Sequence, residues 1–222
     1  MAPFGLSALN SLLGRGVNNT PWQPPEASWS RRFGLGWESP YTVRYASNLD
    51  DGPDHGMPLG GFGAGCLGRS PSGAFNLWNL DGGEHWFGSI PDCQFALWEQ
   101  HGEDVRAHAL ATAPDRDDTD PSGGTPLSAW QWYPASTQGR STGTYAARYP
   151  LSWTHHEDVY RAGVLCEAFS PILPGDYQRT SYPVAVFRWQ FSNPTDQPLE
   201  LSLLLSWRNT VGWFTNTDAA AE

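Results

Sequence analysis

Two neighbouring segments decide the fold of this chain: Val184–Phe191, VAVFRWQF, and Leu199–Trp207, LELSLLLSW. In the second segment apolar residues recur at every other position, so we expect one face to point into the core, formed by Leu199, Leu201, Leu203, Leu205 and Trp207. In the first segment one face carries the aromatic residues Phe187, Trp189 and Phe191. The turn-like sequence NPTDQP at Asn193–Pro198 separates the two. Period-2 patterning on both sides of a turn predicts antiparallel strands with one buried face.

Similar short segments occur earlier in the chain. Cys93–Glu99 and Asp104–Leu110 predict a hairpin that turns around Gly102, and Gly73–Leu80 predicts a further strand. The chain has 24 Gly and 19 Pro, which favours many turns over long helices. We therefore predict an all-β chain. A two-sheet antiparallel β-sandwich should occupy residues 56–222, and an irregular lead-in rich in Pro, Gly and Trp should pack on it from residues 1–55.

Composition excludes several functions and suggests a compartment. The net charge of −10 speaks against nucleic-acid binding, which favours a basic surface. All 13 basic residues are Arg, so no lysine can form a Schiff base or hold a phosphate. The three cysteines lie far apart, as in proteins of a reducing compartment. We expect no signal peptide and no membrane span, which needs about 20 apolar residues, and hence a cytoplasmic protein.

The glycine-rich stretch Gly56–Arg69, GMPLGGFGAGCLGR, contains the dinucleotide-binding pattern G-x-G-x-x-G. That mechanism needs a strand before the glycines and a helix after them, because the helix N-terminus holds the pyrophosphate. Here Pro71 and Gly73 stand where the helix would begin. We interpret the stretch as a structural entry into the sandwich, and we expect no cofactor.

Two polar segments offer metal ligands without the spacing of a known site. In Ala113–Pro126 the calcium-loop pattern fails because Pro126 stands where a glutamate is needed. The sequence His155-His156-Glu157-Asp158 contains suitable residue types, but it lies between two strand-like segments and is expected to form a turn. We therefore predict no metal site.

The residues Glu84, His85 and Trp86 combine a carboxylate, an imidazole and an indole in one glycine-bounded loop. Such a trio could contact a sugar, with the indole against the pyranose ring and the polar groups at the hydroxyls. Loop residues that pack on a neighbouring domain would have the same composition. The sequence leaves both alternatives open.

The chain resembles the start of glycoside hydrolase family 116, a family of β-glucosidases and non-lysosomal glucosylceramidases. The resemblance extends over nearly the whole chain, in the ordered motifs PEASWSRRFG (Pro25–Gly34), GMPLGGFGAGCLGR, GAFNLWNL, DCQFALW (Asp92–Trp98), ARYPLSW (Ala147–Trp153), EAFSPILPGDYQRTSYPVAVFRW (Glu167–Trp189) and SLLLSWRNTVGW (Ser202–Trp213). One departure is Gly175, where relatives often carry a bulkier polar residue.

The resemblance implies a retaining enzyme with an N-terminal β-sandwich and an (α/α)6 catalytic domain. Its Glu nucleophile and Asp acid/base, about 5–5.5 Å apart in retaining enzymes, belong to the catalytic domain. We therefore expect no catalytic residue here. The expected partners are the (α/α)6 domain of the same protein and a glucoside, with cleft contacts from Glu84, His85, Trp86, Arg208 and Asn209. The alternatives are a free-standing carbohydrate-binding module and a remnant left unstable by open sheet edges.

Overall fold

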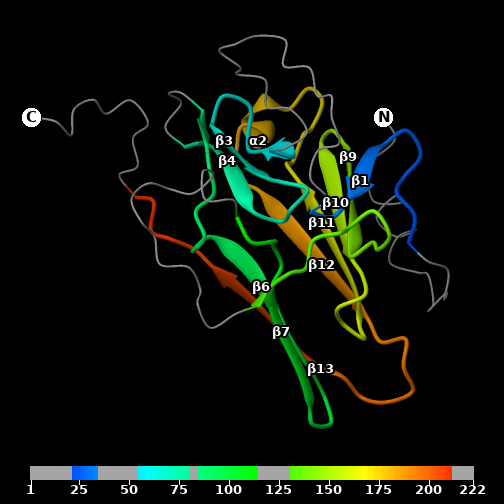
Figure 1. Cartoon of the computed structure of the whole chain (residues 1–222). Helices are drawn as coiled ribbons and strands as arrows, with labels where there is room; N and C mark the ends of the chain where they lie inside the picture. The colour runs from blue at the N-terminus through cyan, green and yellow to red at the C-terminus, as the bar shows by residue number, and fades with distance from the viewer. Residues whose placement is uncertain (1–21, 35–54, 81–84, 115–130, 212–222) are drawn as a thin grey trace, which may run out of the picture.

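The chain folds into mainly antiparallel β-sheets that pack face to face (Figure 1), and its short β7–β8 pair is parallel. The structure is a computed structural model, and it describes residues 22–34, 55–80, 85–114 and 131–211. One sheet has five strands in the order β1-β9-β10-β11-β12: β1 (Trp29–Arg32), β9 (Gly143–Arg148), β10 (Leu151–His156), β11 (Gly163–Phe169) and β12 (Val186–Ser192). Every neighbouring pair in this sheet is antiparallel.

Two four-stranded sheets lie against the five-stranded one. The first has the order β2-β3-β4-β5: β2 (Met57–Leu59), β3 (Cys66–Arg69), β4 (Phe75–Asn79) and β5 (Trp86–Phe87). The second has the order β13-β6-β7-β8: β13 (Glu200–Ser206), β6 (Gln94–His101), β7 (Asp104–Ala109) and β8 (Gln131–Trp132). A short helix, α2 (Tyr177–Thr180), lies between β11 and β12 in the chain. No helix in the described part of the chain is long and apolar enough to cross a membrane.

The aromatic core lies between the five-stranded sheet and both smaller sheets. Phe187 of β12 meets Phe75 of β4 edge-on, with 5.7 Å between the ring centroids, and it meets Phe95 of β6 at 5.1 Å. The core includes Phe33, Trp78, Leu97, Leu110 and Val164, all fully buried. The all-β sandwich predicted from the sequence is thus confirmed, with one of its two layers divided into two sheets.

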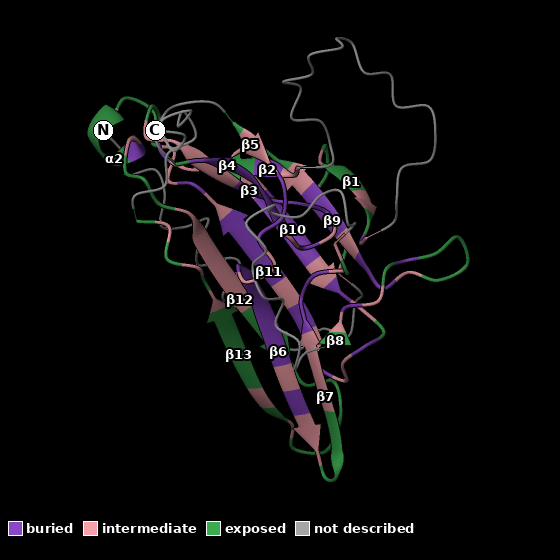
Figure 2. Ribbon diagram, turned by 60° about the vertical axis from the view of Figure 1, so that its left-hand side comes forward, coloured by how far each residue is buried: buried purple, intermediate pink, exposed green. Residues whose placement is uncertain are grey.

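The predicted strands near the C-terminal side are confirmed, but the predicted burial of one of them is wrong. β6 and β7 form the expected hairpin, and β13 pairs with β6 along its whole length. Trp207, which follows β13, packs inward against Phe75 and Trp78, so the apolar face has the predicted direction. Figure 2 nevertheless shows β13 exposed along most of its length. Leu203 and Leu205 are 40% and 50% exposed because β13 lies at the edge of its sheet.

The glycine-rich stretch forms β2, a turn and β3, as a structural role requires. No helix follows it, because Ser70–Gly73 turns directly into β4. Gly61 lies against the chain that leaves α2. A Cβ there would stand 2.4 Å from the carbonyl oxygen of Tyr182, so a side chain would force the two backbones apart.

One predicted turn is wrong in part, and several predictions fall outside the described residues. His155 and His156 belong to β10, whose pairing with β11 continues through both residues, and the turn begins only at Glu157. The described residues contain no group of three His, Cys, Asp or Glu side chains that could hold a metal ion. Glu84, most of the acidic loop of residues 113–126 and most of the lead-in lie outside the described ranges.

Candidate functional site

Three tryptophans form a row that extends from β5 across β4 to the residue that follows β13. The central one, Trp78 of β4, is fully buried. The ring centroid of Trp86 lies 6.4 Å from that of Trp78 on one side, and that of Trp207 lies 5.5 Å away on the other. We call these three residues the Trp78 row. Of its members, Trp207 is 40% exposed and Trp86 is half-buried.

Local backbone geometry fixes the row. Trp78 donates a hydrogen bond from Nε1 to the carbonyl oxygen of Gly88, 2.9 Å away. A Cβ at Gly88 would stand 2.6 Å from the ring of Trp86, so a side chain there would displace this indole from its position. β4 and β5 pair with Trp78 directly opposite Trp86, which brings the two indoles to the same face.

Of the predicted trio, the structure describes His85 and Trp86, and these two side chains have different neighbours. Trp86 points toward the Trp78 row, whereas the neighbouring His85 stacks on Phe87, which follows Trp86 in β5. On that other side the His85 Nε2 lies 3.9 Å from the thiol of Cys66, and Phe87 also contacts His55. Since successive residues of a strand face opposite sides, the indole and the imidazole cannot line one sugar ring together.

Arg208 and Asn209 lie immediately after Trp207. The guanidinium of Arg208 contacts Oδ2 of Asp92 at 2.9 Å, and its backbone N–H donates to the Cys93 thiol at 3.3 Å. These bonds fasten the end of β13 to the start of β6. Asn209 is exposed, and its Oδ1 accepts a hydrogen bond from the backbone N–H of Val211. The structure thus brings Arg208 and Asn209 to the same end of the sandwich as Trp86.

Among the described residues two acidic side chains, Glu99 and Glu167, are buried, and both accept hydrogen bonds or pair with a cation. Glu99 of β6 accepts backbone hydrogen bonds from Arg161 and Ala162 at 2.9 and 2.8 Å. Glu167 of β11 accepts from the indole of Trp153 at 3.0 Å and pairs with Arg188 at 2.8 Å. Both carboxylates hold strands and turns in place, so neither is a free acid or nucleophile that faces a substrate cavity.

A buried cation lies in the centre of the sandwich, where the sequence analysis did not expect one. Arg69 of β3 donates to the carbonyl oxygen of Leu110 at 2.8 Å and to Thr154 Oγ1 at 3.2 Å. Its guanidinium carbon also lies 5.7 Å from the ring centroids of Phe95 and Trp189. Burial lowers the pKa of Arg69, and burial raises the pKa of the nearby Cys166 thiol to about 12. That thiol is therefore protonated and unreactive at neutral pH.

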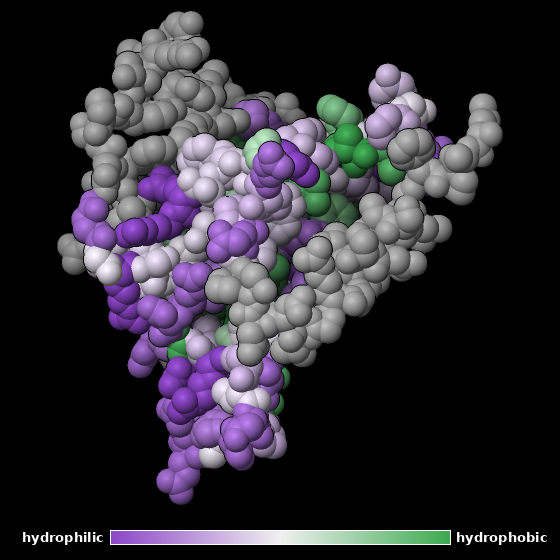
Figure 3. All heavy atoms as spheres, turned by 90° about the vertical axis from the view of Figure 1, so that its right-hand side faces the viewer, coloured by the Kyte–Doolittle hydropathy of each residue, from purple (hydrophilic) through white to green (hydrophobic). Residues whose placement is uncertain are grey.

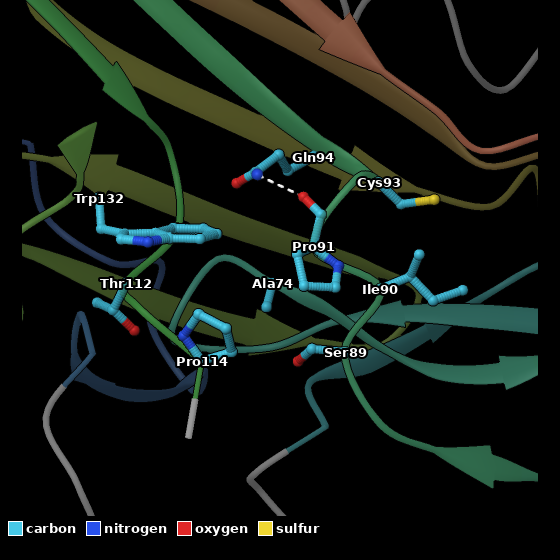
Figure 4. Close-up of a pocket in the computed structure, with 10 residues that line it drawn as sticks. Ala74, Ser89, Ile90, Pro91, Cys93, Gln94, Thr112, Pro114 and Trp132 are labelled. Carbon is cyan, nitrogen blue, oxygen red and sulfur yellow. Dashed lines mark hydrogen bonds between the residues drawn. The ribbon is translucent and has the colours of Figure 1, made fainter. Parts of the chain in front are cut away.

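Two surface pockets are the remaining candidate binding sites. Figure 4 shows a small pocket between the β4 turn and β8, in which the Gln94 amide already donates to the Pro91 carbonyl at 2.5 Å. Its walls are mainly apolar, with the hydroxyls of Ser89 and Thr112 and the Gln94 amide as polar groups, and the lining residues include no carboxylate or imidazole. The second hollow is an open groove between β1, β2 and β9. It is lined by Trp29, Met57, Pro58, Tyr145, Ala147 and Tyr149.

The open groove carries two exposed rings. Trp29 is 41% exposed and Tyr149 is 58% exposed, while Trp29 also meets the buried Tyr145 edge-on at 6.0 Å. Figure 3, which views the molecule from the side of β1 and β9, shows mostly hydrophilic residues on the described surface, with hydrophobic residues in small groups. The groove is therefore an aromatic hollow in a largely polar face.

Comparison with protein families gives a match over most of the chain. The model of the N-terminal domain of glycosyl-hydrolase family 116, described as beta-glucosidase 2, matches residues 56–222. The matched region begins at the glycine-rich stretch and includes β2 through β13. The Trp78 row, Arg208 and Asn209 all lie within it.

Proposed function

This chain belongs to the glycosyl-hydrolase family 116 N-terminal domain family, and from this premise we propose that it is the non-catalytic sandwich domain of a retaining β-glucosidase. Its partner is the (α/α)6 catalytic domain of the same protein. The substrate is a β-glucoside, either glucosylceramide-like or another glucoside. The three cysteines of the chain form no disulfide, which supports a reducing, cytoplasmic setting.

The observation that carries this proposal is the exposure of Trp207, at one end of the Trp78 row, and of the apolar side chains around it. Trp207 and Leu205 are 40% and 50% exposed although they belong to the inner face of β13, and Val211 is 91% exposed. Large apolar side chains exposed together mark a contact surface for another domain. Arg208 is already held by Asp92, which gives this surface a fixed polar rim. We place the catalytic domain against this end of the sandwich.

The same geometry supports a role beside the substrate cleft and no role in bond cleavage. Retaining hydrolysis needs two carboxyl groups on either side of one glycosidic bond. The buried carboxylates Glu99 and Glu167 are bound by backbone amides, an indole and a guanidinium. The five predicted residues remain our candidates for contacts at the rim of the cleft: Glu84, His85, Trp86, Arg208 and Asn209.

An activity assay tests the absence of catalysis. We expect the purified chain to release no aryl alcohol from an aryl β-glucoside above the buffer rate. Turnover that persists through purification and is unchanged in a Glu84→Ala variant would contradict the proposal.

Variants of the whole enzyme test the rim. We expect His85→Ala and Asn209→Ala to raise KM about 2- to 10-fold, as for the loss of one hydrogen bond worth roughly 0.5–1.5 kcal/mol. Val105→Ala is the matched control, because Val105 is 50% exposed beside the turn of the β6–β7 hairpin. Equal KM values for all three variants would remove these residues from the cleft.

A carbohydrate-binding module remains a second candidate, favoured by the groove of Trp29 and Tyr149. Exposed aromatic rings can stack on sugars, and both rings border the same hollow. We expect millimolar glucoside to change the tryptophan fluorescence of the chain if the groove binds sugar, and Trp29→Ala to abolish that change. A response that survives Trp29→Ala, or no response at all, would reject this second role.

A further inference from the structure

The inner face of β10 carries polar side chains only. Its residues are Ser152, Thr154 and His156, which alternate along the strand and are all buried. Ser152 shares a side-chain hydrogen bond with Tyr145 of the neighbouring strand β9, and Thr154 accepts one from the guanidinium of Arg69 at 3.2 Å. Two of the three side chains are therefore paired, as nearly all buried polar groups are, either with protein groups or with ordered water.

His156 is the unpaired member of this face. Its ring lies among aromatic rings, with centroid distances of 4.8 Å to Phe33, 4.9 Å to Tyr133 and 6.2 Å to Trp189. Nδ1 and Nε2 are both shielded from solvent, and neither has a hydrogen-bond partner among the described residues. The ring is neutral, because burial holds the pKa of His156 well below its usual value. A neutral imidazole has one donor and one acceptor nitrogen, so one group of each kind is unpaired.

Two neighbouring side chains also have an unpaired nitrogen. The indole of Trp189 stacks on His156 with 16° between the planes, and its buried Nε1 has no partner among the described residues. Arg69 lies with its guanidinium carbon 5.7 Å from the same indole. It donates to Thr154 and Leu110, whereas its buried Nε has no partner in the described part of the chain. Unpaired nitrogens from β3, β10 and β12 thus gather in one part of the core.

The balance of donors and acceptors decides what can pair with these nitrogens. Nε of Arg69 and Nε1 of Trp189 can only donate, while His156 offers one donor and one acceptor. An anion would accept from the N–H groups but would leave the acceptor nitrogen of His156 unpaired. A water molecule can accept from Arg69 or Trp189 and donate to His156. Buried waters typically make about three such bonds, which these side chains can supply.

We propose that the centre of the sandwich contains an internal water site, at which ordered water joins His156 of β10 to Trp189 of β12 and Arg69 of β3. The water pairs the last polar side chain on the inner face of β10. Through Arg69 it also connects the five-stranded sheet to the sheet that packs on it. The site shares no residue with the Trp78 row or with the lining of the Trp29 groove, and the proposal does not depend on the glycosidase role.

NMR contacts between water and the indole N–H protons test the site within one unmodified molecule. Trp78 and Trp153 are matched internal controls, because their buried Nε1 groups donate to the Gly88 carbonyl at 2.9 Å and to the Glu167 carboxylate at 3.0 Å. In the purified chain with isotope-labelled tryptophan, we expect a water cross-peak at the Trp189 indole proton and none at the two controls. Opposite signs of this peak in NOESY and ROESY spectra identify a long-lived water, whereas equal signs identify proton exchange with the solvent.

A pair of variants tests the part of His156. His156→Phe keeps an aromatic ring of similar size among the same neighbours but removes both nitrogens, so we expect the water cross-peak of Trp189 to disappear. His155→Phe is the matched control, because His155 is the preceding residue of β10 and lies on its other face, where it contacts Glu157. We expect this variant to keep the cross-peak. Trp189→Phe assigns the resonance.

A crystal structure of the unmodified chain is the second test and needs no variant. We expect density for a water at about 2.7–3.2 Å from a nitrogen of His156 and from Nε1 of Trp189 or Nε of Arg69. Crystals grown in bromide distinguish water from an anion, because bromide scatters anomalously. An anomalous peak at this site would overturn the proposal, as would direct bonds from these nitrogens to protein groups.

Two NMR results would also overturn the proposal. The first is the same water contact at all three indoles, or at none of them. The second is a Trp189 cross-peak that persists in His156→Phe, because the water would then not depend on the imidazole.

Discussion

β6 and β13 are paired neighbours in one sheet, yet the side chains on their shared inner face differ in how deeply they are buried. Leu97 of β6 is covered by the opposite sheet and is fully buried. Leu203, its direct partner on β13, is 40% exposed. The two leucines lie on the same face of one sheet, and they differ in whether the opposite sheet covers them. Alternation along a strand thus identifies a face, whereas burial depends on what lies across from it.

Truncation of the two leucines should give the largest difference. We expect Leu97→Ala to lower the free energy of unfolding by about 2–5 kcal/mol, because it leaves a cavity in a packed core. Leu203→Ala should cost roughly 1 kcal/mol or less, because the side chain is already half in water. Urea unfolding of both variants measures the two values. Equal losses would show that Leu203 is covered in solution.

Arg69 allows the same comparison between a buried and an exposed side chain to be made for a charged residue. We expect Arg69→Met to lower the free energy of unfolding by about 1–3 kcal/mol, because it leaves the carbonyl oxygen of Leu110 without its donor inside the core. Arg32→Met is a suitable control, since Arg32 is exposed and donates to the Thr137 and Gln138 carbonyls at the surface. Thermal unfolding of both variants gives the comparison. A larger loss for Arg32→Met would contradict the assignment of Arg69 to the core.

His156 should make the folding stability of the chain depend on pH. Its ring is fully buried against Phe33 and Tyr133, and burial lowers its pKa well below the usual value. Below about pH 6.5 the unfolded chain therefore binds a proton that the folded chain refuses. Stability should fall as the pH is lowered from 7, by at most about 1.4 kcal/mol per pH unit for this group.

The variant His156→Phe should reduce this slope without abolishing it, because burial also lowers the pKa values of His155 and His108. Urea unfolding at pH 7, 6 and 5 provides the measurement. An unchanged slope in His156→Phe would mean that this ring is not buried in solution.

Loss of the ion pair between Asp92 and Arg208, beside the end of β13, should have the smallest effect on the free energy of unfolding. Both side chains are about a quarter exposed, so solvent screens the pair. We expect Asp92→Asn to cost no more than about 1 kcal/mol of unfolding free energy. A loss of stability as large as that of Leu97→Ala would mean that the end of β13 is buried in the core.

The sequence predicted the strands well, because period-2 patterning is a local property. The hairpin of β6 and β7 and the aromatic face of β12 follow from it directly. The burial of Leu203 and Leu205 could not be predicted, because it depends on whether a second layer extends beyond β13. The same limit affects β4, in which all five residues are buried, so its sequence pattern could not show how deeply it lies in the sandwich.

The candidate site was predicted less completely. Trp86 and Arg208 were identified from their chemistry, and the structure brings both to the Trp78 row. The row itself depends on contacts between β4, β5 and β13, which no local pattern encodes. The separation of His85 from Trp86 follows from strand alternation at β5, a strand of two residues that is too short to recognise from its sequence. The buried Arg69 gave no signal beyond a single charged residue after a run of glycines.

Amide hydrogen exchange tests the central claim, that the end of the sandwich at the Trp78 row is a domain contact surface. The segments to compare are Trp86–Phe87 and 207–211, measured in the isolated chain at low concentration and in the whole enzyme. We predict that both segments exchange more slowly in the whole enzyme, while the amides of β6 exchange equally slowly in both. Equal exchange rates for these two segments with and without the catalytic domain would contradict the account.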